Sequence, residues 1–340
     1  MKKIPESKID LTELYKMTNG QVRSKLLLAG IELKIFNHLC EPESAQEVAR
    51  STGFHPENTR IFLDGLVAAG LVKKNEGRYQ NSPETQASLA EGTSTCIGEM
   101  VALMMQGLEG ALKNLPDLVK QGPPLPQKKI DMGTEETWAR YAASMANYQR
   151  AGLTSLAVDI VSSLPEFSGF HKMLDLGGGP GIVGLAIVGS HPEMTGVIFD
   201  RPAVVRIAEN FIKEYEMESR VSVIGGDYMQ DSFGKGYDLI WASTSLNFAG
   251  PDLDIPIKKA YDALNPGGLF ISLADGLTCE GTEPTEYVLN KLPNALMGWD
   301  MGMHRGMIAE SMERVGFSIV AKRTVETSMM PMDLDIAKKD

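Results

Sequence analysis

Cysteine is scarce in this chain: among its 340 residues only Cys40, Cys96 and Cys279 are cysteines. They are far apart and form no Cys-x-x-Cys pair, so the sequence suggests neither a zinc site nor a disulfide framework. No cluster of histidines and acids has metal-ligand spacing either, and we expect no metal. Long apolar runs are also missing, because no stretch approaches the roughly 20 apolar residues of a membrane span. The first residues, MKKIPESKIDL, lack the apolar core of a signal peptide, which predicts a cytoplasmic protein.

Basic residues are outnumbered. The chain has 33 lysines and arginines against 44 acids, a net charge of -11. This balance repels phosphate backbones and anionic membrane surfaces, so nucleic acid and membranes are disfavoured as partners. The length is sufficient for two domains with a sizeable core.

The first of three regions, residues 1–95, is predicted to be helical with one hairpin. VRSKLLLAGIELKIFNHL has apolar residues at helical spacing. Ser44 and Glu47 have the spacing of a capping box, and HPENTRIFLDGLVAAG should begin a helix at Pro56 and stop at Gly70. Two short strands around an Asn-Glu-Gly turn follow. Helix, helix, hairpin is the order of a winged helix.

The other two regions differ in pattern. Residues 96–165 are predicted to be a helical connector, and 166–340 alternate short apolar strands with helical stretches. The strands are KMLDLG, GVIFD, VSVIGGD, YDLIWAS and GLFISLAD. This alternation predicts an α/β domain with a doubly wound, mostly parallel sheet. Ligands of such sheets bind at the carboxyl ends of the strands.

A glycine-rich turn, MLDLGGGPG at 173–181, follows the first of these strands. Bare glycines let a ligand come close to the backbone, and the following helix offers free N–H groups. Gly179, Gly181 and Gly184 also spell the dinucleotide pattern Gly-x-Gly-x-x-Gly, and a tight turn without a ligand is a further alternative.

Three acids at successive strand ends favour a different ligand. Asp175 precedes the glycines, Asp200 ends the second strand and Asp227 ends the third. Asp200 can accept hydrogen bonds from both hydroxyls of a ribose, and Asp227 can accept one from an adenine amino group. A cationic amino acid would suit Asp175. Adenosine with a methionine tail, S-adenosylmethionine, fits all three acids.

The ordered motifs LDLGGGPG, FDRP, GGDYM and ALNPGG resemble the class I methyltransferase fold. Nearly the whole chain resembles the plant-type small-molecule O-methyltransferases, which have many bacterial members. The resemblance implies a dimerising N-terminal region, hence a homodimer, with S-adenosylmethionine as cofactor and a small-molecule acceptor. It implies cofactor contacts at Asp175, Gly177, Gly179, Gly181, Asp200, Arg201, Asp227, Tyr228, Met229 and Ser243.

The sequence departs from this family where the resemblance implies a histidine base. The corresponding stretch is WASTSLNFAGPDLD, and the motif falls on Leu246, Asn247 and Phe248. The five histidines, at 38, 55, 171, 191 and 304, lie outside it.

Three accounts follow. The acceptor needs no base, so that position and desolvation suffice; another group serves; or methyl transfer is lost while the cofactor is retained. The candidate catalytic residues are His304, Asn247 and Asp275, with Asp300 a further possible base. The histidine-free loop also resembles the branch that methylates a carbon of bacteriochlorophyll precursors.

Methionine is abundant, at 19 residues. Soft filling of the core is one interpretation, and an adaptable apolar pocket for a flat acceptor is the other. The pocket hypothesis predicts acceptor contacts at Met104, Met145, Met297, Trp299, Met301 and Met303, with Met145 resembling a family position near the reacting centre.

Two alternatives to methyl transfer stay open. The first is a ligand-responsive winged-helix regulator, although its would-be recognition helix carries Glu57, Asn58, Arg60 and Asp64, a poor surface for phosphates. The second is an enzyme of the same fold that uses the cofactor without moving its methyl group.

Overall fold

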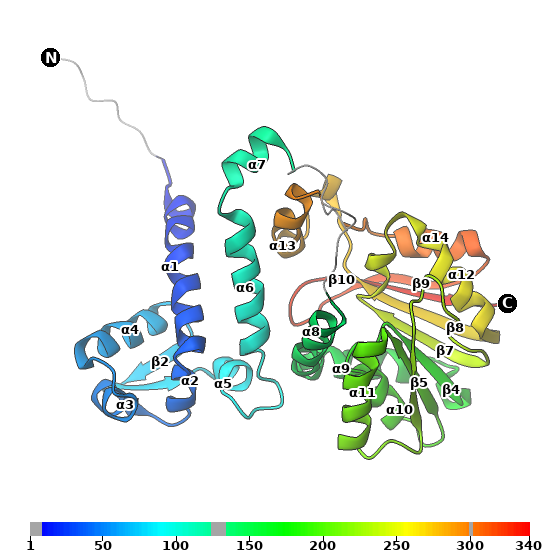
Figure 1. Cartoon of the computed structure of the whole chain (residues 1–340), viewed down its shortest axis with the longest axis horizontal. Helices are drawn as coiled ribbons and strands as arrows, with labels where there is room; N and C mark the ends of the chain where they lie inside the picture. Colours follow the sequence, from blue (N-terminus) through cyan, green and yellow to red (C-terminus); the bar gives the residue numbers. More distant parts are fainter. Residues whose placement is uncertain (1–8, 124–133, 299–301) are drawn as a thin grey trace. The chain divides into compact units, whose positions relative to one another are not determined.

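The computed structural model describes residues 9–123, 134–298 and 302–340. The chain divides into two compact units, residues 1–107 and 108–340 (Figure 1). None of the helices in these described residues is long and apolar enough to cross a membrane.

The first unit is a small helical domain with a three-stranded antiparallel sheet in the order β1-β3-β2. Its elements are α1 (Thr12–Glu32), α2 (Ile35–His38), β1 (Glu43–Ser44), α3 (Ala45–Thr52), α4 (Pro56–Ala68), β2 (Val72–Asn75), β3 (Arg78–Asn81) and α5 (Pro83–Leu89). Helix α6 (Gly98–Leu112) runs from this unit into the second.

Local sequence determines much of this unit. The Ser44 hydroxyl accepts a 3.3 Å hydrogen bond from Glu47 N, and the Glu47 carboxylate accepts a 2.7 Å bond from Ser44 N, so the predicted capping box is confirmed. Pro56 occupies the first turn of α4, and β2 and β3 form the predicted hairpin. Phe36 and Leu63 are fully buried in the core between these elements.

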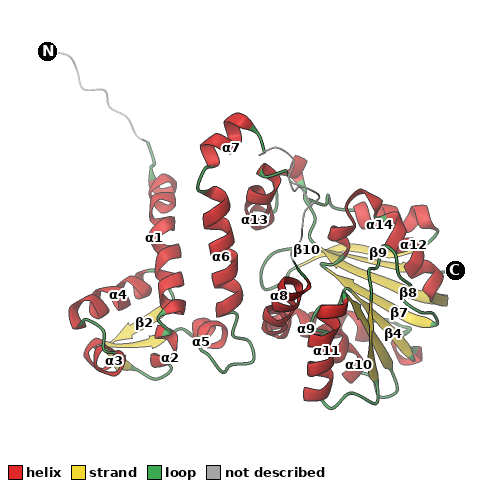
Figure 2. Ribbon diagram, in the orientation of Figure 1, coloured by secondary structure: helices red, strands yellow, loops and turns green. Residues whose placement is uncertain are grey.

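The second unit is built on a seven-stranded sheet in the order β6-β5-β4-β7-β8-β10-β9 (Figure 2). The strands are β4 (Lys172–Leu176), β5 (Thr195–Asp200), β6 (Val221–Gly225), β7 (Tyr237–Ser243), β8 (Leu264–Ala274), β9 (Ser318–Val325) and β10 (Met332–Lys338). The first five are parallel to one another, and β10 pairs antiparallel with both β8 and β9. The predicted α/β, mostly parallel fold is confirmed.

Helices cover both faces of the sheet (Figure 1). The helices of this unit are α7 (Leu115–Gln121), α8 (Glu135–Tyr148), α9 (Thr154–Ser162), α10 (Ile182–Gly189), α11 (Pro202–Glu214), α12 (Asp254–Ala263), α13 (Thr285–Leu296) and α14 (Met307–Val315). Helices α9, α10 and α11 share one buried cluster with the sheet, and α12 and α14 share the other. Alternate residues of a strand enter opposite clusters, as Met173 and Leu174 of β4 do.

The sheet reverses its strand order between β4 and β7. From β4 the chain adds β5 and β6 on one side, and then returns to add β7 and β8 on the other. The carboxyl ends of β4 and β7 therefore flank the crevice in which open α/β sheets bind ligands.

Two details differ from the pattern in the sequence. The stretch 137–164 reads as helical throughout, but a π-helical turn, Gln149–Leu153, separates α8 from α9, with Gly152 at a φ of 136°. The structure also contains two antiparallel strands, β9 and β10, which are not among the five strands that the alternation predicts.

Candidate functional site

The glycine-rich turn joins β4 to α10 at the strand-order reversal. Gly177 and Gly179 have φ values of 69° and 59°, a conformation that favours glycine. A side chain at Gly177 would collide with Ser245, whose hydroxyl donates a 2.8 Å hydrogen bond to Leu176 O. At Gly179 the only described atom within 4 Å of an added Cβ is Nε2 of Gln149. Packing against Ser245 therefore requires a glycine at position 177, whereas Gly179 leaves open space beside the loop.

Asp175 lies beneath this loop. It is 1% exposed, and its carboxylate accepts a 3.0 Å hydrogen bond from Gly184 N at the start of α10. Burial raises the pKa of this carboxyl to about 7. An added Cβ at Gly178 or Gly184 would press on the carboxylate. The described hydrogen bond of Asp175 thus holds the loop against α10.

Asp200 ends β5 beside the open part of the loop. Its Oδ2 accepts a 2.8 Å hydrogen bond from Gly179 N, and its Oδ1 accepts a 2.7 Å bond from Arg201 N. Burial is the largest influence on the carboxyl and raises its pKa. The structure therefore brings together Asp200, Arg201 and Gly179, which the sequence predicts as one site.

The segment after β6 is tied to its neighbours. Asp227 accepts a 2.8 Å hydrogen bond from Met229 N, and the Tyr228 hydroxyl donates a 3.0 Å bond to Ser245 O. Lys259 of α12 donates a 2.7 Å bond to Tyr228 O. Burial raises the pKa of the Tyr228 phenol, which keeps it a donor. The ends of β6 and β7 are thereby fixed relative to each other.

Helix α8 and the π turn bring further side chains to these strand ends. Trp138 packs edge-to-face on Phe248, with their ring centroids 5.4 Å apart. The Arg201 guanidinium lies 5.2 Å from the centre of the Trp138 ring. Glu135 accepts a 3.0 Å hydrogen bond from Ala203 N and so caps α11.

Three polar atoms in α8, in the π turn and in the segment after β7 are buried without a hydrogen-bond partner among the residues that the structure describes. They are Nε1 of Trp138, Oε1 of Gln149 and Oδ1 of Asn247. An unpaired buried polar group costs free energy, and of these three side chains Gln149 contacts the glycine loop. The sequence interpretation included Asn247 but missed Trp138 and Gln149, whose burial depends on the packing of α8 and the π turn.

The other predicted catalytic residues lie in different surroundings. Asp275 follows β8, half-buried; burial raises its pKa, and the nearby Lys291 opposes that shift. Burial and the charge of Asp275 raise the pKa of Tyr148 at the end of α8. His304 is exposed and pairs through its backbone with Leu277.

The predicted acceptor-contact residues come from several elements. Met145 is half-buried in α8, and Met297 ends α13. Met303 is 7% exposed and packs in the core cluster that contains Ile308 and Met312, which favours the core interpretation for this residue. Met104 belongs to the first unit. Trp299, Asp300 and Met301 lie outside the described residues. Ser243 ends β7, half-buried.

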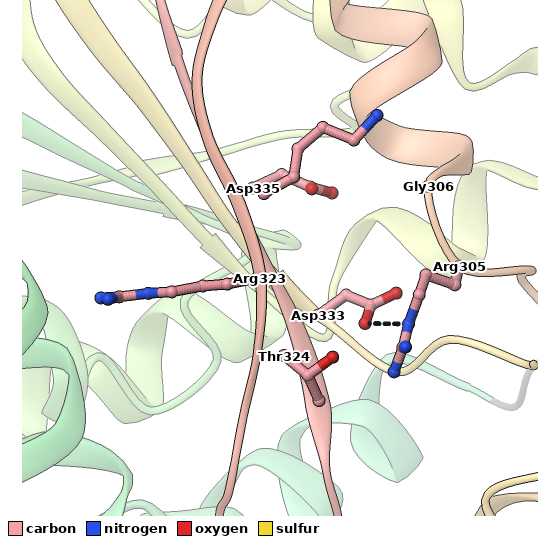
Figure 3. Close-up of a pocket in the computed structure, with 7 residues that line it drawn as sticks. Arg305, Gly306, Arg323, Thr324, Asp333 and Asp335 are labelled. Carbon is pink, nitrogen blue, oxygen red and sulfur yellow. Dashed lines mark hydrogen bonds and ion pairs between the residues drawn. The ribbon is translucent and has the colours of Figure 1, made fainter.

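A separate cavity of about 210 Å³ lies against β9 and β10 (Figure 3). Arg305 faces Asp333, with Nε 2.8 Å from its carboxylate, and Asp335 lies two residues further along β10. In Figure 3 the side chain of Arg323 extends away from both carboxylates. The cavity shares no residue with the glycine loop.

In comparisons with known proteins, both units match domains of one family. Residues 129–314, more than half of the chain, match the O-methyltransferase domain, and residues 15–91 match the O-methyltransferase dimerisation domain. The N,N-dimethyltransferase OxyT of Streptomyces rimosus is 28% identical over 298 residues, 84% of each chain.

Two solved structures have the same fold over almost the whole chain. Human N-acetylserotonin methyltransferase, in complex with S-adenosylmethionine (SAM), has a TM-score of 0.77 and 21% identity, and the match covers 99% of both chains. PigF with S-adenosylhomocysteine (SAH) has a TM-score of 0.77 and 20% identity, covering 98% of this chain and 100% of that one.

Proposed function

The chain belongs to the O-methyltransferase family, and from that premise we propose that it transfers a methyl group from S-adenosylmethionine to a small apolar or aromatic acceptor without a histidine base. The observation that carries the proposal is the open glycine loop beside the Asp200 carboxylate, together with the stretch Leu246–Phe248, which has no histidine where the resemblance implies the histidine motif.

The residues present fit the cofactor. Gly179 leaves the loop open, and Asp200 holds two carboxylate oxygens beside it, which suits the vicinal hydroxyls of a ribose. Asp227, with Tyr228 and Met229, surrounds the place for an adenine one strand further along. Asp175 acts indirectly by holding the loop against α10.

The chain contributes position and desolvation to the reaction. S-adenosylmethionine, when bound, supplies an electrophilic methyl group on a sulfonium. Trp138 and Phe248 present apolar surface near the ends of β5 and β7, where a bound acceptor would cover the 43% of Phe248 that is exposed. The Asn247 carbonyl accepts a hydrogen bond from the acceptor and orients its nucleophilic atom. Met145, on the same helix as Trp138, contributes apolar contact to the acceptor.

The missing imidazole limits the kind of acceptor. An asparagine amide orients an N–H or O–H but does not take up its proton at neutral pH. Acceptors that react without a strong base are a thiolate, a neutral amine, a low-pKa hydroxyl or an activated carbon. The name of OxyT as an N,N-dimethyltransferase supports nitrogen as one such atom. The resemblance of the histidine-free loop to the branch that methylates a carbon of bacteriochlorophyll precursors is the reason to include carbon.

Asp275 is the side chain best suited to serve as a base if the acceptor requires one. It lies at the carboxyl end of β8, and its charge influences Tyr148 beside the π turn. His304 is exposed, which does not suit proton transfer in a water-excluding pocket.

The first unit supports a homodimer. It matches a dimerisation domain, and its α1 exposes apolar side chains, among them Leu14 at 60% and Tyr15 at 69%. A second copy of the same surface would remove this area from water.

The test uses the full-length protein. Calorimetric titration should show binding of S-adenosylmethionine and of S-adenosylhomocysteine, and no binding of generic duplex DNA. Thiols, phenols, aromatic amines and tetrapyrroles are then screened by the release of S-adenosylhomocysteine. DNA binding without cofactor binding would replace the proposal by the winged-helix regulator. Cofactor binding with a different product would favour the same-fold enzyme that does not transfer the methyl group.

A further inference from the structure

Thr244 directly follows β7 and has a φ of 50°. This left-handed conformation is unfavourable for a residue with a branched side chain, so it persists only where the surrounding structure holds it. The next residue, Ser245, is 6% exposed and precedes the stretch that contains Asn247. The position of Asn247 therefore depends on the contacts that hold Thr244 and Ser245.

Backbone atoms of two strands hold these residues. The amide of Thr244 donates a 2.9 Å hydrogen bond to the carbonyl oxygen of Leu273 in β8. The hydroxyl of Ser245 donates a 2.8 Å bond to the carbonyl oxygen of Leu176, the last residue of β4. Both acceptors belong to the sheet, so these two bonds connect the segment after β7 to the rigid part of the second unit.

A further contact comes from the side chain of Tyr228, in the segment after β6. Its hydroxyl donates a 3.0 Å hydrogen bond to the carbonyl oxygen of Ser245, which also accepts a 3.4 Å bond from Phe248 N. Burial raises the pKa of the phenol, so it remains a donor at neutral pH. A phenylalanine would fill the same space without the donor. The hydroxyl of Tyr228 thus supplies a contact to this segment that depends on one side-chain atom.

Tyr228 also belongs to the proposed cofactor site. It lies between Asp227 and Met229, in the turn proposed to surround the adenine. Lys259 of α12 donates a 2.7 Å hydrogen bond to the backbone oxygen of Tyr228, and Asp227 accepts a 2.8 Å bond from Met229 N. A ligand that restricts this turn also restricts the hydroxyl that reaches Ser245.

We propose that the Tyr228 hydroxyl is a positioning group that couples the two parts of the site, so that cofactor bound at the turn after β6 steadies the segment that contains Asn247. This inference rests on the proposed function, in which Asn247 orients the acceptor. The cofactor then prepares the acceptor site through a hydrogen bond between protein groups, without itself contacting that segment.

Hydrogen exchange of the full-length protein, read by mass spectrometry, tests the coupling with S-adenosylhomocysteine as the probe. In the wild type, saturating ligand should slow exchange in the peptide that covers residues 244–252 by about 3- to 10-fold, the effect of one neutral hydrogen bond. Tyr228→Phe should lose most of this slowing. Its affinity for the ligand should stay within about threefold of the wild type in calorimetric titration, because the ring is kept and the hydroxyl is bonded to Ser245.

Kinetics provide a second measurement once the screen identifies an acceptor. Tyr228→Phe should lower kcat/KM for that acceptor by about 3- to 10-fold, because Asn247 is then less well positioned. Tyr237→Phe is the matched control. Tyr237 is another buried phenol, at the opposite end of β7, and its hydroxyl donates to the carbonyl oxygen of Phe233. This variant loses a comparable hydrogen bond but should keep both the slowing and the kcat/KM of the wild type.

Three results would overturn the inference: full slowing in Tyr228→Phe, equal loss of slowing in Tyr237→Phe, or a wild type that binds S-adenosylhomocysteine without any slowing in residues 244–252. A loss of affinity of more than about tenfold in Tyr228→Phe would also overturn it, because the hydroxyl would then bind the cofactor directly. Failure of the wild type to bind S-adenosylhomocysteine would instead overturn the proposed cofactor itself.

Discussion

The backbone amide of Gly179 donates a 2.8 Å hydrogen bond to Oδ2 of Asp200. This bond joins the loop after β4 to the end of β5, so the most open glycine of the turn and the acid proposed for the ribose form one unit. Asp200 also accepts from Arg201 N at the start of α11. Two backbone amides fix the orientation of this carboxylate. A ligand that displaces neither amide therefore binds there with little free-energy cost of reorganisation.

Replacement of Asp200 should weaken cofactor binding. We expect Asp200→Ala to lower the affinity for S-adenosylhomocysteine by about 1–3 kcal/mol, because two ribose hydroxyls lose a charged acceptor. Calorimetric titration measures the change. Asp262→Ala is the control, since Asp262 is an exposed acid that pairs with Lys258 on α12. Unchanged affinity in the Asp200 variant would move the cofactor to another part of the chain.

Much of this arrangement could be predicted from the sequence, because its signals are local. Ser44 and Glu47 form a capping box within four residues, and each β-strand of the parallel part is a short apolar run followed by a turn. The sequence also predicts that Asp200 and Asp227 lie at the carboxyl edge of the sheet, because an acid at the end of a parallel strand lies there whatever the strand order.

The remainder depends on contacts between distant segments. Gln149 and Gly178 are 29 residues apart, and Trp138 and Phe248 are 110 apart, so no local pattern identifies them as neighbours. The π turn that brings Gln149 to the loop interrupts a helical pattern, and the local signal for it is Gly152, a poor helix former within the turn. For Asp175 the strand-end position predicts a ligand contact, whereas its hydrogen bond to α10 depends on Gly184, nine residues further along the chain.

Replacement of Asn247 should reduce turnover of the acceptor without changing the affinity for the cofactor. With an acceptor identified by the screen, Asn247→Ala should reduce kcat/KM by about tenfold, the effect of one lost hydrogen bond to a reacting group. The affinity for S-adenosylhomocysteine should not change. Steady-state kinetics measure kcat/KM, and calorimetric titration measures the affinity for S-adenosylhomocysteine. An Asn247 variant with full activity would remove this residue from the acceptor site.

The pH dependence of the rate tests the base-free account. If no protein group takes the proton, the single-turnover rate should follow the ionisation of the acceptor, or be flat for a carbon nucleophile. His304→Gln should then leave this rate nearly unchanged, and chelators should not affect activity. A fall of about 10²–10⁴-fold in the His304 variant, with cofactor binding intact, would make His304 the base.

The stability of the second unit should depend on Asp335. This side chain is 5% exposed, and burial, together with Asp333, raises its pKa to about 6, although Lys322 and a backbone hydrogen bond from Ala309 oppose the shift. In the unfolded chain the carboxyl titrates near 3.8. The folded state therefore binds more protons between these values, and stability falls as the pH rises through this range.

Urea denaturation at pH 5.0 and pH 7.5 measures this effect. Between pH 5.0 and pH 7.5 the ionisation of Asp335 should lower the free energy of unfolding of the wild type by about 1–2 kcal/mol. The Asp335→Asn variant should not show this decrease. Asp117→Asn, at an exposed position of α7, is the control. An equal pH dependence in wild type and Asp335→Asn would show that the carboxyl is not destabilised by burial.

The exposed apolar face of α1 should determine whether the chain is a dimer. Leu14, Tyr15 and Val22 project on one side of this helix, and all three are more than half exposed in the single chain. Burying a carboxylate in a face of this kind is costly, so Val22→Asp should convert a dimer to a monomer at micromolar concentration. Multi-angle light scattering reads out the mass.

The matched control is Ser24→Asp, which adds the same charge to an exposed position on the opposite side of the same helix. It should leave the dimer intact, because a solvated aspartate there stays in water in the assembly. Loss of the dimer in both variants would assign the effect to the stability of α1 instead of to the interface. A wild-type chain that is monomeric at micromolar concentration would contradict the homodimer, and the dimerisation domain would then have to bind a different partner.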